Sequence, residues 1–179
     1  GLVEMPRAHT VSGLVVDEDG LPLPGIDMNV YDATGTAIDL FNDDTNAQGL
    51  FSVLVPEGTW TIRHRVVTPI AGIERIDHEI ADLPVLAGID LGTVVLPLGY
   101  HIQGIVTGSA GELIQGADFD ALYALTGESI YIASDTSNSN GSFDILLPEG
   151  DIVIEVDPPL TGPVRVPKKR TLSLAPISP

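Results

Sequence analysis

The feature that most constrains this chain is an internal repeat, in which two halves of the sequence carry the same landmarks in the same order. Residues 10–16 match residues 101–107 at an offset of 91, with Gly13 aligned to Gly104. After one inserted residue the offset is 92, and GLFSVLVPEG at 49–58 matches GSFDILLPEG at 141–150. The shared order of glycines, a phenylalanine and a Pro-Glu-Gly turn indicates two copies of one domain.

Apolar and polar residues alternate within both copies, which is the period of a half-buried β-strand. Residues 26–31 read Ile-Asp-Met-Asn-Val-Tyr, and residues 51–55 read Phe-Ser-Val-Leu-Val. Each such segment is bounded by Gly, Pro, Asn or Asp, and no stretch combines a helical period with helix caps. The sequence therefore predicts an all-β chain of two tandem antiparallel β-sandwiches, with about seven strands in each.

The repeat also predicts the domain boundaries. Residues 1–9 have no counterpart in the repeat and form an N-terminal arm, residues 10–99 form the first sandwich, and residues 100–179 form the second. If Leu174 is aligned with Leu96, about 14 residues are missing from the second copy. We therefore expect the second sandwich to lack a loop or a strand.

One segment of the first copy has a family pattern, Gly13-x-Val15-x-Asp17-x-x-Gly20-x-Pro22-Leu23-x-Gly25. Together with Thr45-Asn46-x-x-Gly49-x-Phe51 it resembles carboxypeptidase regulatory-like domains. The second copy departs from the pattern at Gly108 and Leu113, where the first has Asp17 and Pro22. The resemblance implies transthyretin-like, immunoglobulin-like β-sandwiches of secreted or cell-surface proteins of bacteria and archaea. It further implies a non-catalytic role as a spacer, stalk, adhesion or accessory-binding module.

The charge of the chain argues against several classes of partner. Eight basic residues against 25 acidic ones give a net charge of −17, which repels nucleic acids and anionic membranes. The absence of cysteine excludes disulfides and thiolate chemistry. No apolar run reaches the roughly 18 residues of a membrane span, so we expect no membrane insertion. An extracellular or cell-surface location fits this composition and the resemblance.

No motif in the sequence indicates catalysis. The four histidines lack metal-ligand spacing, and there is no nucleophile elbow or phosphate-binding loop. The Tyr-Arg-Gly-Ser ending of the transthyretin-like hydrolases is replaced here by Ala175-Pro-Ile-Ser-Pro. His64 falls in phase with Trp60 and Ile62 on a predicted strand, which indicates a packed side chain. We therefore expect no enzyme, with neither catalytic nor cofactor-binding residues.

Acidic turns leave calcium as an open question. The candidate ligands are Asp17, Asp19, Asp43 and Asp44, whose carboxylates suit a hard cation. Residues 44–49 resemble the first half of an EF-hand loop, but Val55 stands where that loop has its bidentate glutamate. The alternative is that Asp and Asn serve only as turn formers.

Basic residues cluster near the end of the sequence, as Arg165, Lys168, Lys169 and Arg170. Residues 1–164 hold 4 basic and 25 acidic residues, a net charge of −21, whereas residues 165–179 carry +4. This asymmetry favours head-to-tail contact between subunits. A charged edge strand that discourages unwanted pairing is the alternative interpretation.

These observations predict a structural protein that self-assembles into a filament or sheath. Residues 1–9 then either add to a neighbour's sheet or form a simple tail. The alternative function is a carbohydrate-binding or adhesion accessory module, with Trp60 and four tyrosines as candidate glycan contacts (Tyr31, Tyr100, Tyr123 and Tyr131). Trp60 aligns with Ile152 of the second copy, which favours a core position instead.

Overall fold

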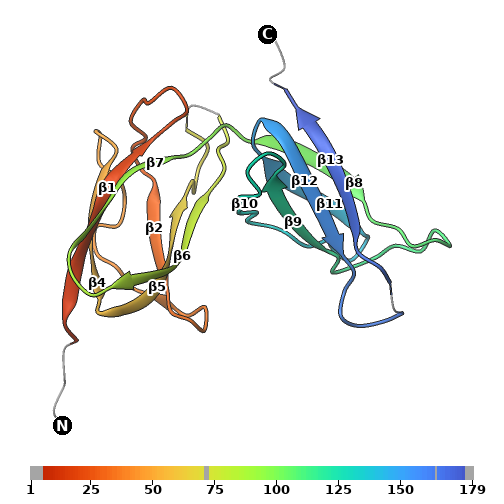
Figure 1. Ribbon diagram of the computed structural model, residues 1–179, viewed down its shortest axis with the longest axis horizontal. Coiled ribbons are helices and arrows are strands. Elements are labelled where there is room, and N and C mark those ends of the chain that lie inside the picture. Colours follow the sequence, from red (N-terminus) through yellow and green to blue (C-terminus); the bar gives the residue numbers. More distant parts are fainter. Residues whose placement is uncertain (1–5, 71–72, 164, 176–179) are drawn as a thin grey trace. The chain divides into compact units, whose positions relative to one another are not determined.

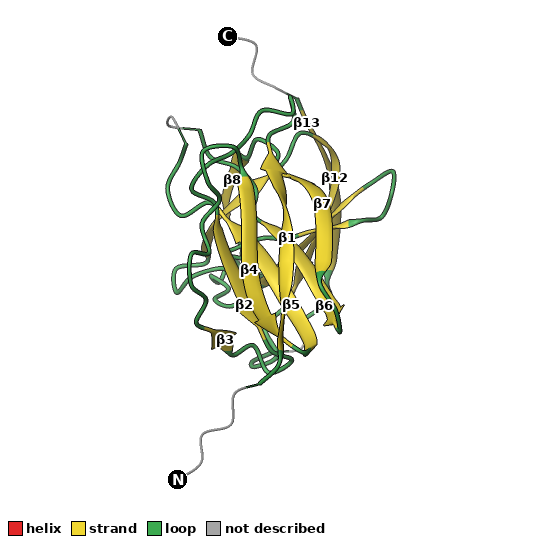
Figure 2. Cartoon of the chain, turned by 90° about the vertical axis from the view of Figure 1, so that its left-hand side faces the viewer, coloured by secondary structure: helices red, strands yellow, loops and turns green. Residues whose placement is uncertain are grey.

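The computed structural model describes residues 6–70, 73–163 and 165–175, and within them every regular element is a strand (Figure 2). The chain divides into two compact units. Unit 1 comprises Gly1–Gly72 and Asp77–Pro97, and unit 2 comprises Ile73–Ile76 and Leu98–Pro179. The prediction of an all-β fold is therefore confirmed.

Unit 1 pairs a three-stranded sheet with a four-stranded sheet (Figure 1). The first sheet has the order β4-β1-β7, built from β1 (Ala8–Val16), β4 (Leu50–Pro56) and β7 (Ile89–Val95). The second has the order β3-β2-β5-β6, built from β2 (Asp27–Tyr31), β3 (Ala37–Ile38), β5 (Gly58–Arg65) and β6 (His78–Val85). All neighbours are antiparallel except β1 and β7, which run parallel.

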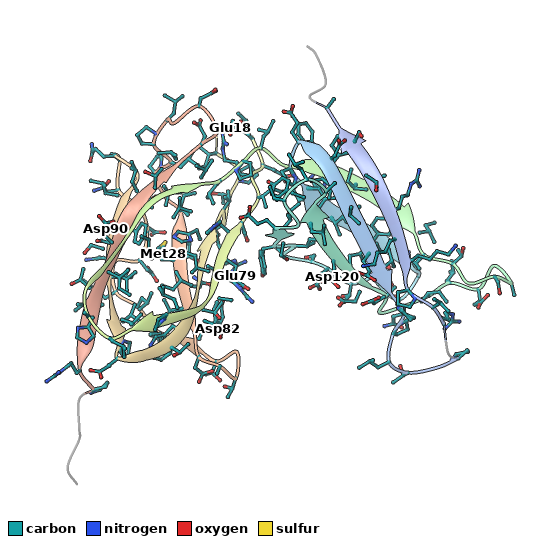
Figure 3. The ribbon with its side chains drawn as sticks, viewed as in Figure 1. Glu18, Met28, Glu79, Asp82, Asp90 and Asp120 are labelled. Atoms are coloured by element: carbon teal, nitrogen blue, oxygen red, sulfur yellow. The ribbon has the colours of Figure 1, made fainter. Side chains whose placement is uncertain are left out.

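The core of unit 1 forms where the alternating patterns of the two sheets meet. Along β4, Phe51, Val53 and Val55 are buried while the residues between them are exposed. Met28 of β2 is fully buried and lies in the interior of the unit (Figure 3). The period of two therefore places one apolar face of each sheet against the other, which is the main source of stability for such a sandwich.

Unit 2 has six described strands. β8 (Tyr100–Ile105) and β11 (Ser142–Leu147) form one sheet. β9 (Asp118–Tyr123), β10 (Ser129–Ile130), β12 (Gly150–Asp157) and β13 (Lys168–Leu174) form the other, in the order β10-β9-β12-β13. The expected count of about seven strands thus holds for unit 1 and is one too many for the described part of unit 2.

The strand without a described counterpart in unit 2 is β7. Gly58 of β5 pairs with Val85 of β6, and the repeat equivalent Gly150 of β12 pairs with Leu174 of β13. β13 therefore corresponds to β6, and Leu174 corresponds to Val85. The alignment of Leu174 with Leu96 was wrong, because it matched two strands that occupy different sheets.

A buried hydroxyl recurs at the same place in both units. In unit 1, the Thr45 hydroxyl accepts a hydrogen bond from the Ile26 amide at 2.9 Å and donates to the Leu23 carbonyl at 2.6 Å. In unit 2, the Ser137 hydroxyl accepts from the Ala117 amide at 2.9 Å and donates to the Ile114 carbonyl at 2.7 Å. The side chain satisfies buried backbone groups where a loop crosses the sandwich edge, so the repeat retains a hydroxyl there.

The structural division differs in two places from the boundaries expected at 1–9, 10–99 and 100–179. β1 begins at Ala8, so the end of the expected arm belongs to a strand, and residues 1–5 lie outside the described residues. The segment Ile73–Ile76 groups with unit 2, where Ile76 is buried in the core and Arg75 forms a β-bridge with Leu98.

Candidate assembly surfaces

Two of the four basic residues near the end of the sequence are paired within unit 2. The Arg165 guanidinium lies 3.0 Å from a carboxylate oxygen of Glu112. The Lys169 ammonium lies 2.6 Å from a carboxylate oxygen of Glu155, directly across the β12–β13 ladder. These side chains already have acidic neighbours, which lowers their capacity to attract a second subunit.

Lys168 and Arg170 differ from this pair in both direction and partners. Arg170 lies opposite Ile154, whose side chain is buried in the core, so Arg170 points to the core side of the sheet at its edge. Lys168 lies two residues away on the same side, opposite Val156. Both are exposed, and neither forms an ion pair with a described residue. They are the available cations of the four.

β8 has one edge that no described strand covers over residues 101–105. The Val106 amide donates to the Gly141 carbonyl on the β11 side, and amides along a strand point alternately to its two edges. The Gly99 amide accordingly points the other way, where it donates to the Glu74 carbonyl. The segment Ile73–Ile76 therefore covers only the beginning of this edge.

The side chains along β8 are also less buried than their equivalents on β1. Val11 and Val15 of unit 1 are fully buried, whereas the corresponding Ile102 and Val106 are half-buried. Ile105 is 62% exposed. The internal repeat did not predict this surface, because Leu174 was aligned with Leu96 of unit 1 instead of Val85. Strand spacing gives the correct alignment, since β6 starts 20 residues after Gly58 and β13 starts 18 residues after Gly150.

His101 connects β8 to the covering segment and to β11. Its Nδ1 lies 2.6 Å from the Asp144 carboxylate, and its Nε2 contacts the Glu74 carboxylate. Hydrogen bonds to Asp144 and then to Glu74 raise the pKa of His101 above its usual value. The same contact with His101 lowers the pKa of Asp144. The charged imidazolium therefore helps to hold residues 73–76 against β8.

The four calcium candidates serve largely as turn and bridge residues. The Asp17 carboxylate accepts hydrogen bonds from the amides of Asp19 and Leu21 at 3.0 and 2.8 Å, which closes a turn. Asp43 accepts the Met28 amide through its carbonyl, and Asp44 forms a backbone bridge near the same strand. Among the described residues, no three His, Asp or Glu side chains gather where they could hold a metal ion. Calcium binding stays an untested prediction.

A groove of about 730 Å³ lies against the outer face of the β4-β1-β7 sheet. Asn42, Asp44, Asn46 and Asp90 supply polar groups to its wall, and Asp90 points away from the body of unit 1 (Figure 3). The aromatic residue in the lining is Phe51, which is buried. This groove has polar groups of the kind that the alternative prediction of a glycan-binding module requires.

Trp60 and His64 both pack into unit 1. Trp60 is half-buried against the core, and its indole N–H donates to the Pro56 carbonyl at 2.7 Å. His64 is fully buried, with its ring 5.4 Å from Phe51 and 5.5 Å from His78. Burial, reinforced by His78, lowers the pKa of His64 to about 4. The expectation that His64 is a packed side chain is confirmed.

The described residues contain no helical segment with the length and apolar character of a membrane span. The searches with family models and against curated proteins found no match.

Solved structures share only distant similarity with this chain. The Bacillus anthracis TIE protein is 13% identical with a TM-score of 0.39, over 94% of this chain and 31% of its own. A streptococcal ancillary pilin is 18% identical with a TM-score of 0.36, over 95% of this chain and 60% of its own. The shaft pilin SpaA from Lactobacillus rhamnosus GG is 14% identical with a TM-score of 0.35, over 94% and 95%. The chain thus spans less than two thirds of the first two proteins, and similarity at this level carries no conclusion about function.

Proposed function

We propose that this chain is a non-catalytic structural subunit of the cell surface or extracellular space, which joins copies of itself head to tail. The observation that carries the proposal is the separation of charge along a chain of β-sandwiches. Residues 1–164 have 4 basic and 25 acidic residues, a net charge of −21. The basic residues that follow lie on or beside β13, an edge strand, where Lys168 and Arg170 are exposed and have no described ion-pair partner.

A contact between two different surfaces of the same chain leaves both surfaces available at the ends of the assembly. Such contacts produce filaments unless the geometry closes a ring. The acidic surface of one subunit and the cationic edge of the next meet this requirement. Complementary charge also speeds the encounter between subunits and weakens as salt screens it.

The test is negative-stain electron microscopy of the purified chain at near-physiological and at high salt, with and without calcium. We expect ordered filaments that shorten or disappear at high salt. The double variant Lys168→Ala, Arg170→Ala should assemble much less than wild type. The matched variant Arg165→Ala, Lys169→Ala loses the same charge but removes side chains that are paired within unit 2, so it should assemble more than the first.

Circular dichroism of both variants checks that the sandwiches remain folded. Dispersed particles of wild type under all conditions would overturn self-assembly. Filaments that form equally well after reversal of all four basic residues to Glu would overturn the electrostatic contribution.

A glycan-binding or adhesion module is the second candidate, supported by the polar groove on unit 1. Its amide, hydroxyl and carboxylate groups suit a sugar, although a planar row of exposed aromatics is the more usual platform. A glycan array on wild type and on Asp90→Ala would test it. Binding to any glycan that the variant loses would favour this function over assembly.

A further inference from the structure

We infer that the uncovered edge of β8 receives a strand from residues 1–6, the first part of the N-terminal arm, of a second copy of this chain. The inference rests on the proposed self-assembly and names the segment that makes the contact. Two observations support it. β7 lies beside β1 in unit 1 while no described strand lies at the same place beside β8 in unit 2, and the residues around that place in unit 2 are apolar and cationic.

In unit 1, β7 fills the position beside β1. It pairs with β1 in parallel from Val11 to Val16, and it places Val94 and the following Leu96 in the core. β7 also lies next to β6 of the opposite sheet, so it closes one side of the sandwich. No described strand does this for unit 2, where residues 101–105 of β8 have backbone groups directed to that side.

The surroundings of this position are apolar on one side and cationic on the other. Ile102 and Val106 supply apolar groups on the core face of β8, and Ile105 supplies one on its outer face. Each of the three is more exposed than its unit 1 equivalent. β13, which corresponds to β6, supplies Lys168 and Arg170 at its edge. A strand that fits here therefore needs several apolar residues and an acidic one.

Pairing an extended segment with an exposed sheet edge is an established mode of association between proteins.

The N-terminal arm has the required composition. It reads Gly-Leu-Val-Glu-Met-Pro. In an extended strand Leu2 and Glu4 share one face, which would bring an apolar group to the core face and a carboxylate to the cations of β13, and Val3 and Met5 share the other face, on the side of Ile105. The arm is also the stretch without a counterpart in the repeat. Because the arm precedes β1 of unit 1 and the acceptor is in unit 2, each subunit both donates and accepts, which gives the open-ended contact that a filament requires.

The experiment measures binding of a fluorescent synthetic peptide of residues 1–7 to the chain that lacks residues 1–6, by fluorescence anisotropy. We expect saturable binding. A control peptide with Leu2, Val3 and Met5 replaced by Ser should bind at least about tenfold more weakly, since it loses the apolar contacts.

Gln103 offers a matched pair of acceptor variants. Its amide points to the uncovered edge, so Gln103→Pro removes one ladder donor there and leaves the β8–β11 hydrogen bonds intact. Gln103→Val loses the same side-chain contact with Asp144 but keeps the amide. We expect Gln103→Pro to weaken peptide binding by about tenfold relative to Gln103→Val.

The outcomes separate this inference from the proposed function. No binding of the arm peptide, or equal binding to both Gln103 variants, would overturn the inference even if wild type forms filaments. Filaments or dimers that form equally well without residues 1–6 would also overturn it, and would indicate that β8 edges pair directly with each other. If the peptide binds but the wild-type chain forms no filaments, the edge of β8 is supported as an acceptor and the proposed filament function is overturned.

Discussion

Units 1 and 2 share their repeat signature and differ in how one side of the sandwich is closed. Both have the Pro-Glu-Gly turn, a glycine against a phenylalanine ring and the buried hydroxyl of Thr45 or Ser137. Unit 1 closes the side between its two sheets with β7, whereas in the described part of unit 2 Ile73–Ile76 covers just the start of that edge. Similar turns and core residues thus specify the same fold, while the described edge strands differ in whether they cover that side of the sandwich.

The edge residues differ in the way this distinction requires. In unit 1, the residues of β6 that lie opposite the core positions of β5 are His78 and Ile80. In unit 2, the residues of β13 that lie opposite the core positions of β12 are Lys168 and Arg170. An apolar residue suits a side that β7 covers, and a cation suits a side open to water. In the proposed contact the same cations would discourage unspecific pairing and favour an acidic donor, so the two interpretations of the basic cluster are compatible.

Removal of the core side chain that directly follows β7 should have the largest effect on this comparison. Leu96 is fully buried in unit 1, so Leu96→Ala should lower the free energy of unfolding of that unit by about 2–5 kcal/mol. Urea unfolding, followed by near-UV circular dichroism for Trp60 and by NMR for unit 2, separates the two transitions.

The matched control is Ile105→Ala in unit 2 at a concentration where the chain is monomeric. Its side chain is largely exposed, so we expect a change of no more than about 0.5 kcal/mol. A loss from Ile105→Ala as large as that from Leu96→Ala would show that the β8 edge is covered in solution.

Acid should destabilise unit 1 through His64. Burial lowers its folded pKa to about 4, while the unfolded chain takes up a proton near 6.5. The stabilisation is therefore complete above pH 6.5 and declines as the pH falls towards 4, by about 3 kcal/mol in total. Urea unfolding of unit 1 between pH 4 and 8 measures this slope.

The repeat supplies the control variant for that measurement. His64 aligns with Val156 of unit 2, so His64→Val places the equivalent residue of the second copy at this position. The variant should lose most of the slope between pH 4 and 6.5. An unchanged slope would place the responsible group elsewhere in unit 1.

The sequence was sufficient to predict the strands and the core, because burial on one face produces a period of two that survives in residues such as Phe51, Val53 and Val55. The edge of β8 could not be predicted in this way. Its apolar residues follow the same pattern as those of β1, and exposure depends on whether another segment lies beside them. The pairing of Lys169 with Glu155 likewise depends on the register of β12 and β13, which the one-dimensional charge count does not contain.

The smallest expected effect concerns His101, and its sign is opposite to that of His64. Asp144 and Glu74 raise the folded pKa of His101, so its contribution is fully present below pH 6.5 and is lost as the pH rises through the folded value. Because the ring is half exposed, solvent reduces the effect on stability, and NMR titration of the imidazole is the sensitive measurement. We expect a raised pKa for His101 that falls in the Glu74→Gln variant, together with faster amide exchange at Gly99, whose amide is bonded to the covering segment.

A pKa of His101 that stays the same in Glu74→Gln would show that this side chain does not hold residues 73–76 against β8. The two histidines would then report on different things: His64 on the closed core of unit 1, and His101 on the β8–β11 sheet alone.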